Sequence, residues 1–340
     1  MIKSFVFGLN VSITKNIMEK KLFKKRHLRM SCFFLLLIIS CSSREIEPSF
    51  TFKENEQGIE LLENGQYVFF YQKKPKLLNG QYVCCNYLHP LYSLNGDTLT
   101  EESPADHPHH RGIFWAWHQM SVNGKSLGDG WIMENIAQEV TNIRTTVDQS
   151  AKLNINAVWR SSLLGDKPFL SEQTTITVHQ FQNGIRKIDF AISLTALVPG
   201  VEIGGSDDEK GYGGFCARIK HPGDLAFVSE NKMVTPQLIQ IEAGPWMDFS
   251  GSFGSEGETS GIAILCHPET PNYPEPWILR SKRSMQNVVF PGRNPVAIPI
   301  DRPVILYYLL IIHNGNASSI DLKKLQSEYE KMEVSNQNGN

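Results

Sequence analysis

Apolar and polar residues alternate with a period of two in several stretches of this chain, and this pattern constrains its fold most. Residues 153–159 (LNINAVW) alternate strictly, residues 188–194 follow the same period, and residues 174–181 do so less strictly. A period of two places one face of a strand inward and the other toward water or a second sheet. The tripeptide Gln182-Asn183-Gly184 separates two of these runs and is a hairpin signal.

Further strands are predicted at residues 65–71, 80–88, 113–118, 213–219, 238–249, 261–266 and 304–313. One helix is predicted near the end, because Leu322, Leu325, Tyr329 and Met332 recur at helical spacing, and Ser318 with Asp321 resembles a capping box. With 340 residues, 41% of them hydrophobic, the chain can bury a sizeable core. We therefore predict an all-β fold: a large two-sheet antiparallel sandwich with one C-terminal helix, forming a single domain over residues 50–333 and followed by a disordered tail at 334–340.

The first forty residues differ from the rest and predict an export signal. A basic stretch precedes the apolar run at residues 32–39 (CFFLLLII), and small residues follow at 40–43. The run is too short to span a bilayer, which takes about 20 apolar residues. A start at Met18 would give a signal of more usual length, so residues 1–17 are a candidate miscalled start. We expect residues 1–40 to be a signal peptide.

Residues 37–41 (LIISC) resemble a bacterial lipobox, which implies cleavage before Cys41, lipidation of its thiol and an anchored tether at residues 41–49. The alternative is an ordinary secreted protein that is cut nearby. We expect an exported lipoprotein of the cell envelope, on the periplasmic or outer-membrane face, that contacts the membrane only through its lipid anchor.

Charge excludes one class of partner. Residues 1–40 hold eight Lys/Arg and one Asp/Glu, which leaves 25 basic and 34 acidic residues and a net charge of −9. Nucleic-acid binding needs a basic face, so nucleic acid is not an expected partner. The four remaining cysteines, Cys84, Cys85, Cys216 and Cys266, lie in apolar surroundings without a C-x-x-C pair. Buried free thiols are expected, although export permits a disulfide.

The densest chemistry lies in the heptapeptide at residues 106–112 (DHPHHRG). Imidazoles are acid/base groups near neutral pH and good metal ligands, and a neighbouring Asp and Arg can set their tautomer and anchor a substrate. Pro108 biases His107 toward extended geometry, and in an extended loop His109 and His110 point to opposite sides. We take His109 or His110 as the candidate general base or acid, with Asp106 orienting an imidazole and Arg111 binding a carboxylate or oxyanion. The alternative is a polar loop that happens to be rich in histidine.

Further candidates lie near other polar clusters. His118 and His267 are second candidates for acid/base work. The candidate substrate-binding residues are His107, Trp117, Trp131, Asp208, Lys210, Arg218, Trp246, Asp248, Trp277 and Arg280. Aromatic faces pack on sugar rings, and charged groups bind hydroxyls or carboxylates, so this composition favours a sugar site. For each tryptophan the alternative is core packing, and for residues 207–214 it is a solvated turn.

Five segments occur in a recognisable order: residues 88–91 (LHPL), the heptapeptide with its Trp-rich continuation, residues 213–215 (GGF), 244–251 (GPWMDFSG) and 267–277 (HPETPNYPEPW). Together they resemble the PmoA-like family of bacterial proteins over roughly residues 80–310. The resemblance implies a secreted or lipid-anchored supersandwich, similar to sugar mutarotases and polysaccharide lyases. The methane-oxygenase label of that family is not carried over, since such a subunit needs membrane spans.

Three functions follow as hypotheses. The first is an enzyme that acts on a sugar or oxidised sugar by His/Asp/Arg acid–base chemistry and needs no cofactor. The second is a metal-dependent enzyme in which His107, His109 and His118 hold one divalent ion. The third is a non-catalytic glycan-binding lipoprotein of the cell surface. There is no Walker loop, G-x-S-x-G or H-E-x-x-H motif in the sequence to favour nucleotide, serine-hydrolase or zincin chemistry.

Overall fold

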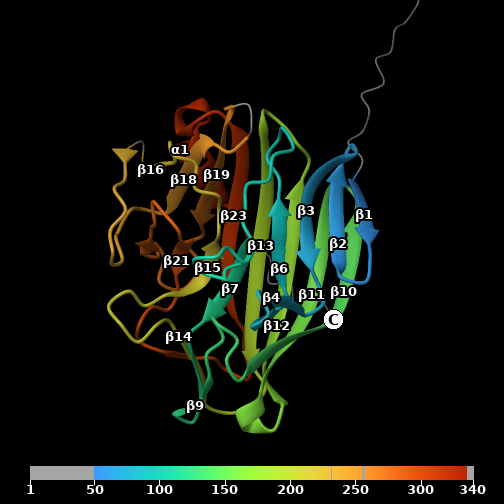
Figure 1. Ribbon diagram of the computed structural model, residues 1–340, viewed down its shortest axis with the longest axis vertical. Helices are drawn as coiled ribbons and strands as arrows, with labels where there is room; N and C mark the ends of the chain where they lie inside the picture. The colour runs from blue at the N-terminus through green and yellow to red at the C-terminus, as the bar shows by residue number, and fades with distance from the viewer. Residues whose placement is uncertain (1–49, 231, 255–256, 335–340) are drawn as a thin grey trace, which may run out of the picture. The chain divides into compact units, whose positions relative to one another are not determined.

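The computed structural model of the protein describes residues 50–230, 232–254 and 257–334. Two large antiparallel sheets dominate this part of the chain (Figure 1). The eight-stranded sheet has, in spatial order, β1 (Phe50–Glu54), β2 (Gly58–Glu63), β3 (Gln66–Gln72), β6 (Tyr87–Leu91), β7 (Ile113–Trp117), β15 (Gly213–Ala217), β21 (Gln286–Val289) and β20 (Trp277–Ile278). The nine-stranded sheet has β10 (Ile136–Val147), β11 (Ser150–Ser161), β12 (Lys167–His179), β13 (Ile185–Ala196), β23 (Val304–Asn314), β19 (Thr259–Cys266), β18 (Trp246–Ser252), β16 (Ala226–Ser229) and β17 (Lys232–Met233).

Smaller elements complete the described part. A four-stranded sheet contains β22 (Val296–Ala297), β14 (Val201–Gly204), β8 (Gln119–Val122) and β9 (Lys125–Gly128), and β4 (Lys76–Leu78) pairs with β5 (Tyr82–Cys84). Two 3-10 turns, η1 (Ser162–Leu164) and η2 (Ala317–Ser319), and one helix, α1 (Leu322–Tyr329), are also present. None of the helices in this part is long and apolar enough to cross a membrane.

The two large sheets share one core between their inner faces. Rings from both sheets meet there: Phe190 of β13 contacts Trp115 of β7 and Phe215 of β15, and Phe215 stacks on Tyr308 of β23 with centroids 4.5 Å apart. The alternating strands supply this core, since Leu153, Ile155 and the other inward residues of β11 are buried while their neighbours face outward. The predicted all-β sandwich is confirmed.

The predicted hairpin between β12 and β13 is confirmed. Asn183 and Gly184 have φ values of 54° and 78°, and Gln182 bridges Ile185. Positive φ at both central residues of a two-residue turn matches the right-handed twist of the flanking strands, which is why Asn-Gly is favoured there.

Two predicted strands have wrong boundaries. The strand predicted at 80–88 is divided between β5 and β6, because Asn86 adopts a left-handed conformation (φ 59°). The strand predicted at 238–249 begins only at Trp246. Gly244 has a φ of 92°, and Pro245 has no N–H to donate to a sheet, so the ladder cannot extend backward through them.

The C-terminal helix is present, but its predicted cap is wrong. Asp321 is the N-cap and accepts a hydrogen bond from the Lys324 N–H, whereas Ser318 lies in η2. Helix α1 packs through Leu322 and Tyr329 on the outer face of the nine-stranded sheet. It covers only the part of this face near β23 and β19 (Figure 1).

A second cluster of buried side chains lies on the outer face of the eight-stranded sheet. Phe114 and Ala116 of β7 and Cys216 of β15 are covered there by the β4–β5 hairpin and by Trp131. The four cysteines of the described residues are buried and free, as expected from the sequence. The predicted signal peptide, Cys41, residues 41–49 and tail residues 335–340 lie outside the described residues.

Candidate functional site

The heptapeptide forms two consecutive turns between β6 and β7. The His107 N–H donates to the Pro104 carbonyl, and the His110 N–H donates to the His107 carbonyl over 2.9 Å. The loop is therefore folded rather than extended, and His109 and His110 do not point to opposite sides. The end of the heptapeptide next to β7 is fixed, because the Gly112 N–H donates to the Glu101 carbonyl and the Arg218 N–H donates to the Gly112 carbonyl.

This folding brings the three imidazoles into contact. The His107 and His110 rings stack with centroids 4.6 Å apart and an interplanar angle of 9°. The His109 ring meets both edge-on, at 5.9 Å from His107 and 4.6 Å from His110. His110 is buried, with 2% of its surface exposed, while His107 and His109 are half-buried. We call these three side chains the histidine cluster, of which only His107 and His109 can meet a ligand.

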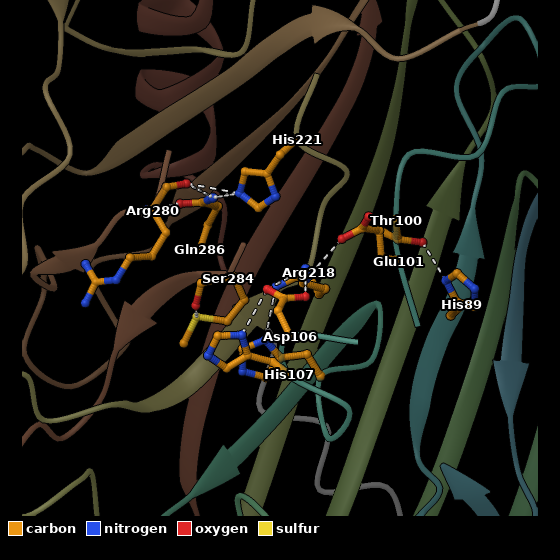
Figure 2. Close-up of polar contacts among 12 residues, drawn as sticks. His89, Thr100, Glu101, Asp106, His107, Arg218, His221, Arg280, Ser284 and Gln286 are labelled. Carbon is orange, nitrogen blue, oxygen red and sulfur yellow. Dashed lines mark hydrogen bonds and ion pairs between the residues drawn. The ribbon is translucent and has the colours of Figure 1, made fainter. Parts of the chain in front are cut away.

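Arg218 connects the cluster to two carboxylates. Its Nε donates to Oε2 of Glu101 at 2.9 Å, and one of its terminal nitrogens donates to Oδ1 of Asp106 at 3.1 Å. Its other terminal nitrogen lies 3.4 Å from Nδ1 of His110. Asp106 in turn lies 3.0 Å from Nδ1 of His107, so that it joins Arg218 to His107 (Figure 2). The Arg218 side chain is only 3% exposed, whereas the side chains of Glu101 and Asp106 are 34% and 25% exposed, so the arginine is the buried centre of the arrangement.

Burial sets the protonation of two members of the cluster. It lowers the pKa of His109 to about 4, with the charges of His107 and Arg111 adding to the effect. Burial also lowers the pKa of His110 well below its ordinary value, and His109 and His107 contribute as well. Burial acts to raise the pKa of Asp106, but the hydrogen bond from His107 and the Arg218 charge outweigh it and lower that pKa. At neutral pH the site therefore holds two neutral imidazoles beside an ionised carboxylate.

Arg111 lies beneath the loop and not on its surface. It is 1% exposed, its guanidinium carbon lies 4.6 Å from the centre of the Phe114 ring, and it donates to the His109 carbonyl at 3.1 Å. Its Nε has no hydrogen-bond partner among the described residues. Burying a guanidinium without a paired carboxylate costs free energy. Arg111 therefore supports the loop through its hydrogen bond to the His109 carbonyl and also leaves an unpaired positive charge beneath it. Direct contact with a substrate, as the sequence suggested, would require the loop to move.

His118 forms a second acid–base pair next to the cluster. Its Nδ1 lies 2.8 Å from Oδ2 of Asp129, while Oδ1 of the same carboxylate accepts the Trp131 N–H. The His118 ring stacks on Trp131 at 4.9 Å, and Trp131 meets His110 edge-on at 6.2 Å. Trp131 is 2% exposed, so its ring packs between the His118–Asp129 pair and the histidine cluster and is not accessible to a sugar.

Arg280 and Tyr212 form a third group of polar contacts beside Trp131. The Tyr212 ring lies 5.8 Å from the Trp131 indole. Arg280 hydrogen-bonds to the Tyr212 hydroxyl and to the backbone carbonyls of Gln237, Leu238 and Leu279. The Arg280 carbonyl accepts from Gln286 and contacts His221 (Figure 2). Arg280 therefore holds three loop segments together with its guanidinium.

Asp208 and Lys210 form an exposed turn. Their side chains pair at 3.4 Å, and Oδ1 of Asp208 accepts hydrogen bonds from the Ser206 hydroxyl and the Lys210 N–H. Partial burial acts to raise the pKa of Asp208, but these hydrogen bonds outweigh it and lower that pKa. The residues act as the solvated turn that the sequence left open as an alternative.

The remaining predicted site residues are buried apart from the cluster. Trp117, Trp246 and Trp277 are at most 2% exposed, and the indole N–H groups of Trp117 and Trp277 donate to the carbonyls of Phe290 and Gly244. Asp248 is fully buried against His313 at 2.7 Å. His267 is buried between Tyr307 and Tyr329. Contact with a substrate would require the surroundings of these residues to open, because their side chains are enclosed in the core. Oδ2 of Asp248 has no hydrogen-bond partner among the described residues.

Sequence reasoning missed two carboxylates of the site. Glu101 is ordinary in sequence, and only the pairing of its loop with the end of β15 brings it to Arg218. Asp129 stands between two glycines in Gly128-Asp129-Gly130, which is a turn signal. The two glycines predict a turn, but they do not predict that the Asp129 carboxylate contacts the His118 imidazole.

A comparison with protein families finds one match, a family of unknown function (DUF6807), over residues 58–327. The chain belongs to the DUF6807 family. The match spans the site described above and every strand of the two large sheets except β1. The comparison with curated proteins gives no match.

The site of this DUF6807 protein does not assemble the predicted metal ligands. In the part of the chain that the structure describes, no three His, Cys, Asp or Glu side chains converge as metal ligands would. His107 and His109 are in ring contact, but His118 is directed to Asp129 and Trp131. The set His107, His109 and His118 is therefore not brought together around one point.

Proposed function

We propose that this protein is an enzyme of the cell envelope that acts on a sugar or an oxidised sugar by acid–base chemistry at the histidine cluster. The observation that carries the proposal is the chain of contacts from Glu101 through Arg218 and Asp106 to His107, with neutral His109 beside it. Carboxylate–imidazole pairs next to a second, uncharged imidazole provide one proton donor and one proton acceptor. Purely structural loops have no need of that arrangement.

In this proposal His107 and His109 are the catalytic residues. Asp106 holds Nδ1 of His107, which leaves Nε2 to exchange a proton with the substrate. His109 is uncharged at neutral pH and can accept a proton from a carbon-bound or hydroxyl hydrogen. Buried His110 is a positioning residue that stacks on His107, so its role differs from the general base expected from the sequence.

The positive charge of Arg111 supports an oxidised or acidic sugar as substrate. Its uncompensated guanidinium lies directly under the His109 carbonyl. An enolate or carboxylate that forms above the cluster would experience this charge across a low-dielectric layer. The resemblance to the PmoA-like family, and the resemblance of residues 37–41 to a lipobox, support a lipid-anchored, carbohydrate-related role.

The test is a proton NMR time course of the purified protein with neutral, uronic and keto-sugar oligosaccharides, with and without divalent metals. We expect new resonances, whose shifts distinguish hydrolysis, elimination and epimerisation. His107→Ala and His109→Ala should each lower kcat at least about 100-fold, as expected when an acid or base group is removed. Arg160→Ala is the control, because Arg160 also pairs with a carboxylate, that of Glu139, but lies on the other large sheet, away from the cluster.

Three outcomes contradict the proposal. Turnover that survives both substitutions in the cluster would place the chemistry elsewhere. Ligand line-broadening without any product would favour the alternative, a glycan-binding lipoprotein of the cell surface. A requirement for a stoichiometric divalent ion would favour the metal-dependent alternative, which the geometry of His118 does not support.

A further inference from the structure

The outer face of the nine-stranded sheet carries a groove that the proposed function does not use. Its volume is about 910 Å³, and it lies over β10, β11, β12 and β13, beside β23 and the segment that follows α1. Volumes of this size accommodate drug-sized or larger ligands. Because the histidine cluster lies on the outer face of the other large sheet, both sheets and the core separate it from the groove.

Strand register arranges the floor of the groove in transverse rows. Arg144 of β10 is opposite Asn154 of β11, which is opposite Thr175 of β12, and the row continues through Ala191 of β13 to Tyr307 of β23. Neighbouring strands lie about 4.8 Å apart, so a five-strand row extends about 19 Å. A second row two residues away contains Asn142, Asn156, Gln173 and Ser193.

The shape of the groove follows from the sizes of these side chains. On β13 the outward residues Ala191 and Ser193 are small, which leaves the floor low. Tyr329 and Met332, at and beyond the end of α1, line the groove beside β23. Helix α1 therefore covers one part of this sheet face and bounds the open part.

The chemistry of the floor favours hydroxyl groups. Amide and hydroxyl side chains predominate in both rows, and these groups donate and accept hydrogen bonds without carrying charge. A sugar ring presents the same mixture of donors and acceptors at close spacing. An outer sheet face that only had to stay in contact with water would not need small residues, Ala191 and Ser193, in its middle and the Tyr329 ring at its edge.

Two cations lie at one edge of the floor. Arg144 and Lys152, on β10 and β11, are diagonal neighbours in the register and make no ion pair within the described ranges. Two carboxylates line the groove away from this edge: that of Asp189 is already paired with His179, and that of Glu333, which follows α1, makes no ion pair within the described ranges. An acidic group on the ligand would therefore find unpaired positive charge at the β10–β11 edge only.

We propose that this groove is a binding site for an acidic oligosaccharide, with the sugar hydroxyls on the Asn/Gln/Thr/Ser floor and a carboxylate at Arg144 and Lys152. The site is separate from the histidine cluster and does not rest on the function proposed for it. It holds the sugar chain and performs no reaction.

The test uses the purified protein and isothermal titration calorimetry with oligogalacturonate and oligoguluronate as acidic probes, and with xylo- and cello-oligosaccharides as neutral ones. Ser193→Trp fills the floor and should weaken acidic-probe binding at least tenfold. Thr195→Trp is the matched control, because Thr195 faces the same side of β13, two residues further on, but does not line the groove. The double variant Arg144→Gln/Lys152→Gln should also bind the acidic probes at least tenfold more weakly, while its affinity for the neutral probes should change little.

The outcomes separate this site from the catalytic one. His109→Ala should leave the calorimetric affinity of the groove unchanged, whatever it does to turnover. The proposal is overturned if none of the four probes binds, if Thr195→Trp weakens binding as much as Ser193→Trp, or if neutral probes bind as tightly as acidic ones. Circular dichroism of each variant shows whether a loss comes from misfolding, and a folded Ser193→Trp with full affinity also overturns it.

Discussion

Arg218 is the residue on which the candidate site most depends. Its guanidinium contacts Glu101, Asp106 and His110 in three directions, with only 3% of the side chain exposed. A lysine carries the same charge but is a point donor and cannot hold three planar partners at once. The orientation of Asp106, and through it of His107, should therefore depend on the arginine and not merely on a positive charge.

We expect Arg218→Lys to lower kcat at least about tenfold and to change KM less, because the substrate still meets His107 and His109 but in a less fixed geometry. Steady-state kinetics on the substrate found by NMR would measure this, with circular dichroism as the check of folding. An unchanged kcat would mean that Arg218 is only structural.

The pH dependence of the rate should reflect the shifted His109. Burial lowers the pKa of His109 to about 4, so the imidazole is neutral down to that pH and is lost as a base only below it. We expect the acid limb of kcat/KM assigned to His109 to fall near pH 4, and not near the ordinary value of 6.5. In the pH profile of His109→Asn that limb should disappear; an acid limb near 6.5 would contradict this assignment.

Contacts within the site were predictable from the sequence only between residues that are close together in the chain. Asp106, His107 and His109 lie in one heptapeptide, and a turn brings them together. Arg218 was recognised from its strand position, but its partner Glu101 was not, because 117 residues separate them. The tryptophans failed as predicted ligand platforms because proximity to polar residues in sequence does not reveal burial, and Trp117 and Trp277 are fully enclosed.

At the scale of elements, the loop from β6 to β7 depends on Gly112. This residue has a φ of 46°, and a Cβ added to it would lie 1.9 Å from the Leu88 carbonyl oxygen. Backbone atoms cannot move aside as a flexible side chain can. The loop therefore reaches β7 only because no side chain is present at this position.

Gly112→Ala should destabilise the protein by about 2 kcal/mol or more. The alanine would be held in the left-handed region of φ, and its Cβ would clash with the Leu88 carbonyl oxygen. Gly124→Ala is the matched control: Gly124 also has a positive φ, 73°, but a Cβ added there would have nothing within 4 Å, so only about 1 kcal/mol is expected. Urea unfolding followed by circular dichroism would measure both. Equal losses in the two variants would show that the Leu88 contact is unimportant.

Element types were predictable where local pattern and turn chemistry agree. The β12–β13 hairpin combines alternation with Asn-Gly, and the helix near residue 322 combines a 3.6-residue period with an acidic N-cap. Boundaries were less predictable, as Asn86 and Pro245 show, because one left-handed residue or one missing N–H ends a strand that hydrophobicity would continue. The order of strands in the sheets depends on long-range pairing, which no local pattern contains.

At the scale of the whole molecule, buried ionisable groups make the stability depend on pH. Burial lowers the pKa of His89 and of His109 to about 4 each, and lowers the pKa of His110 well below its ordinary value. Between about pH 4 and 6.5 the unfolded chain binds these protons and the folded chain does not, so stability rises with pH. Glu275 acts in the opposite direction, because burial raises its pKa to about 7 and the folded chain retains a proton that the unfolded chain loses.

Burial also lowers the pKa of His221, so four histidines oppose one glutamate in that window. We therefore expect the urea midpoint of unfolding to fall as pH decreases from 6.5 to 4.5. Denaturation curves at half-unit intervals would measure it. Glu275→Gln, which removes the opposing group, should raise stability at pH 8 relative to the native chain and change it much less at pH 4.5, where Glu275 of the folded native chain is already protonated. A midpoint that rises as the solution is acidified would contradict the expected balance.

The tryptophans, which did not prove to be sugar platforms, give the protein a different property. All six are at most 2% exposed, and among the described residues Trp131 is the one whose indole meets imidazoles, those of His118 and His110. The other five supply a constant background of emission from buried indoles. A change in fluorescence at constant fold therefore reports on the surroundings of Trp131, so that this chain carries its own optical probe of the histidine loop, with no label attached.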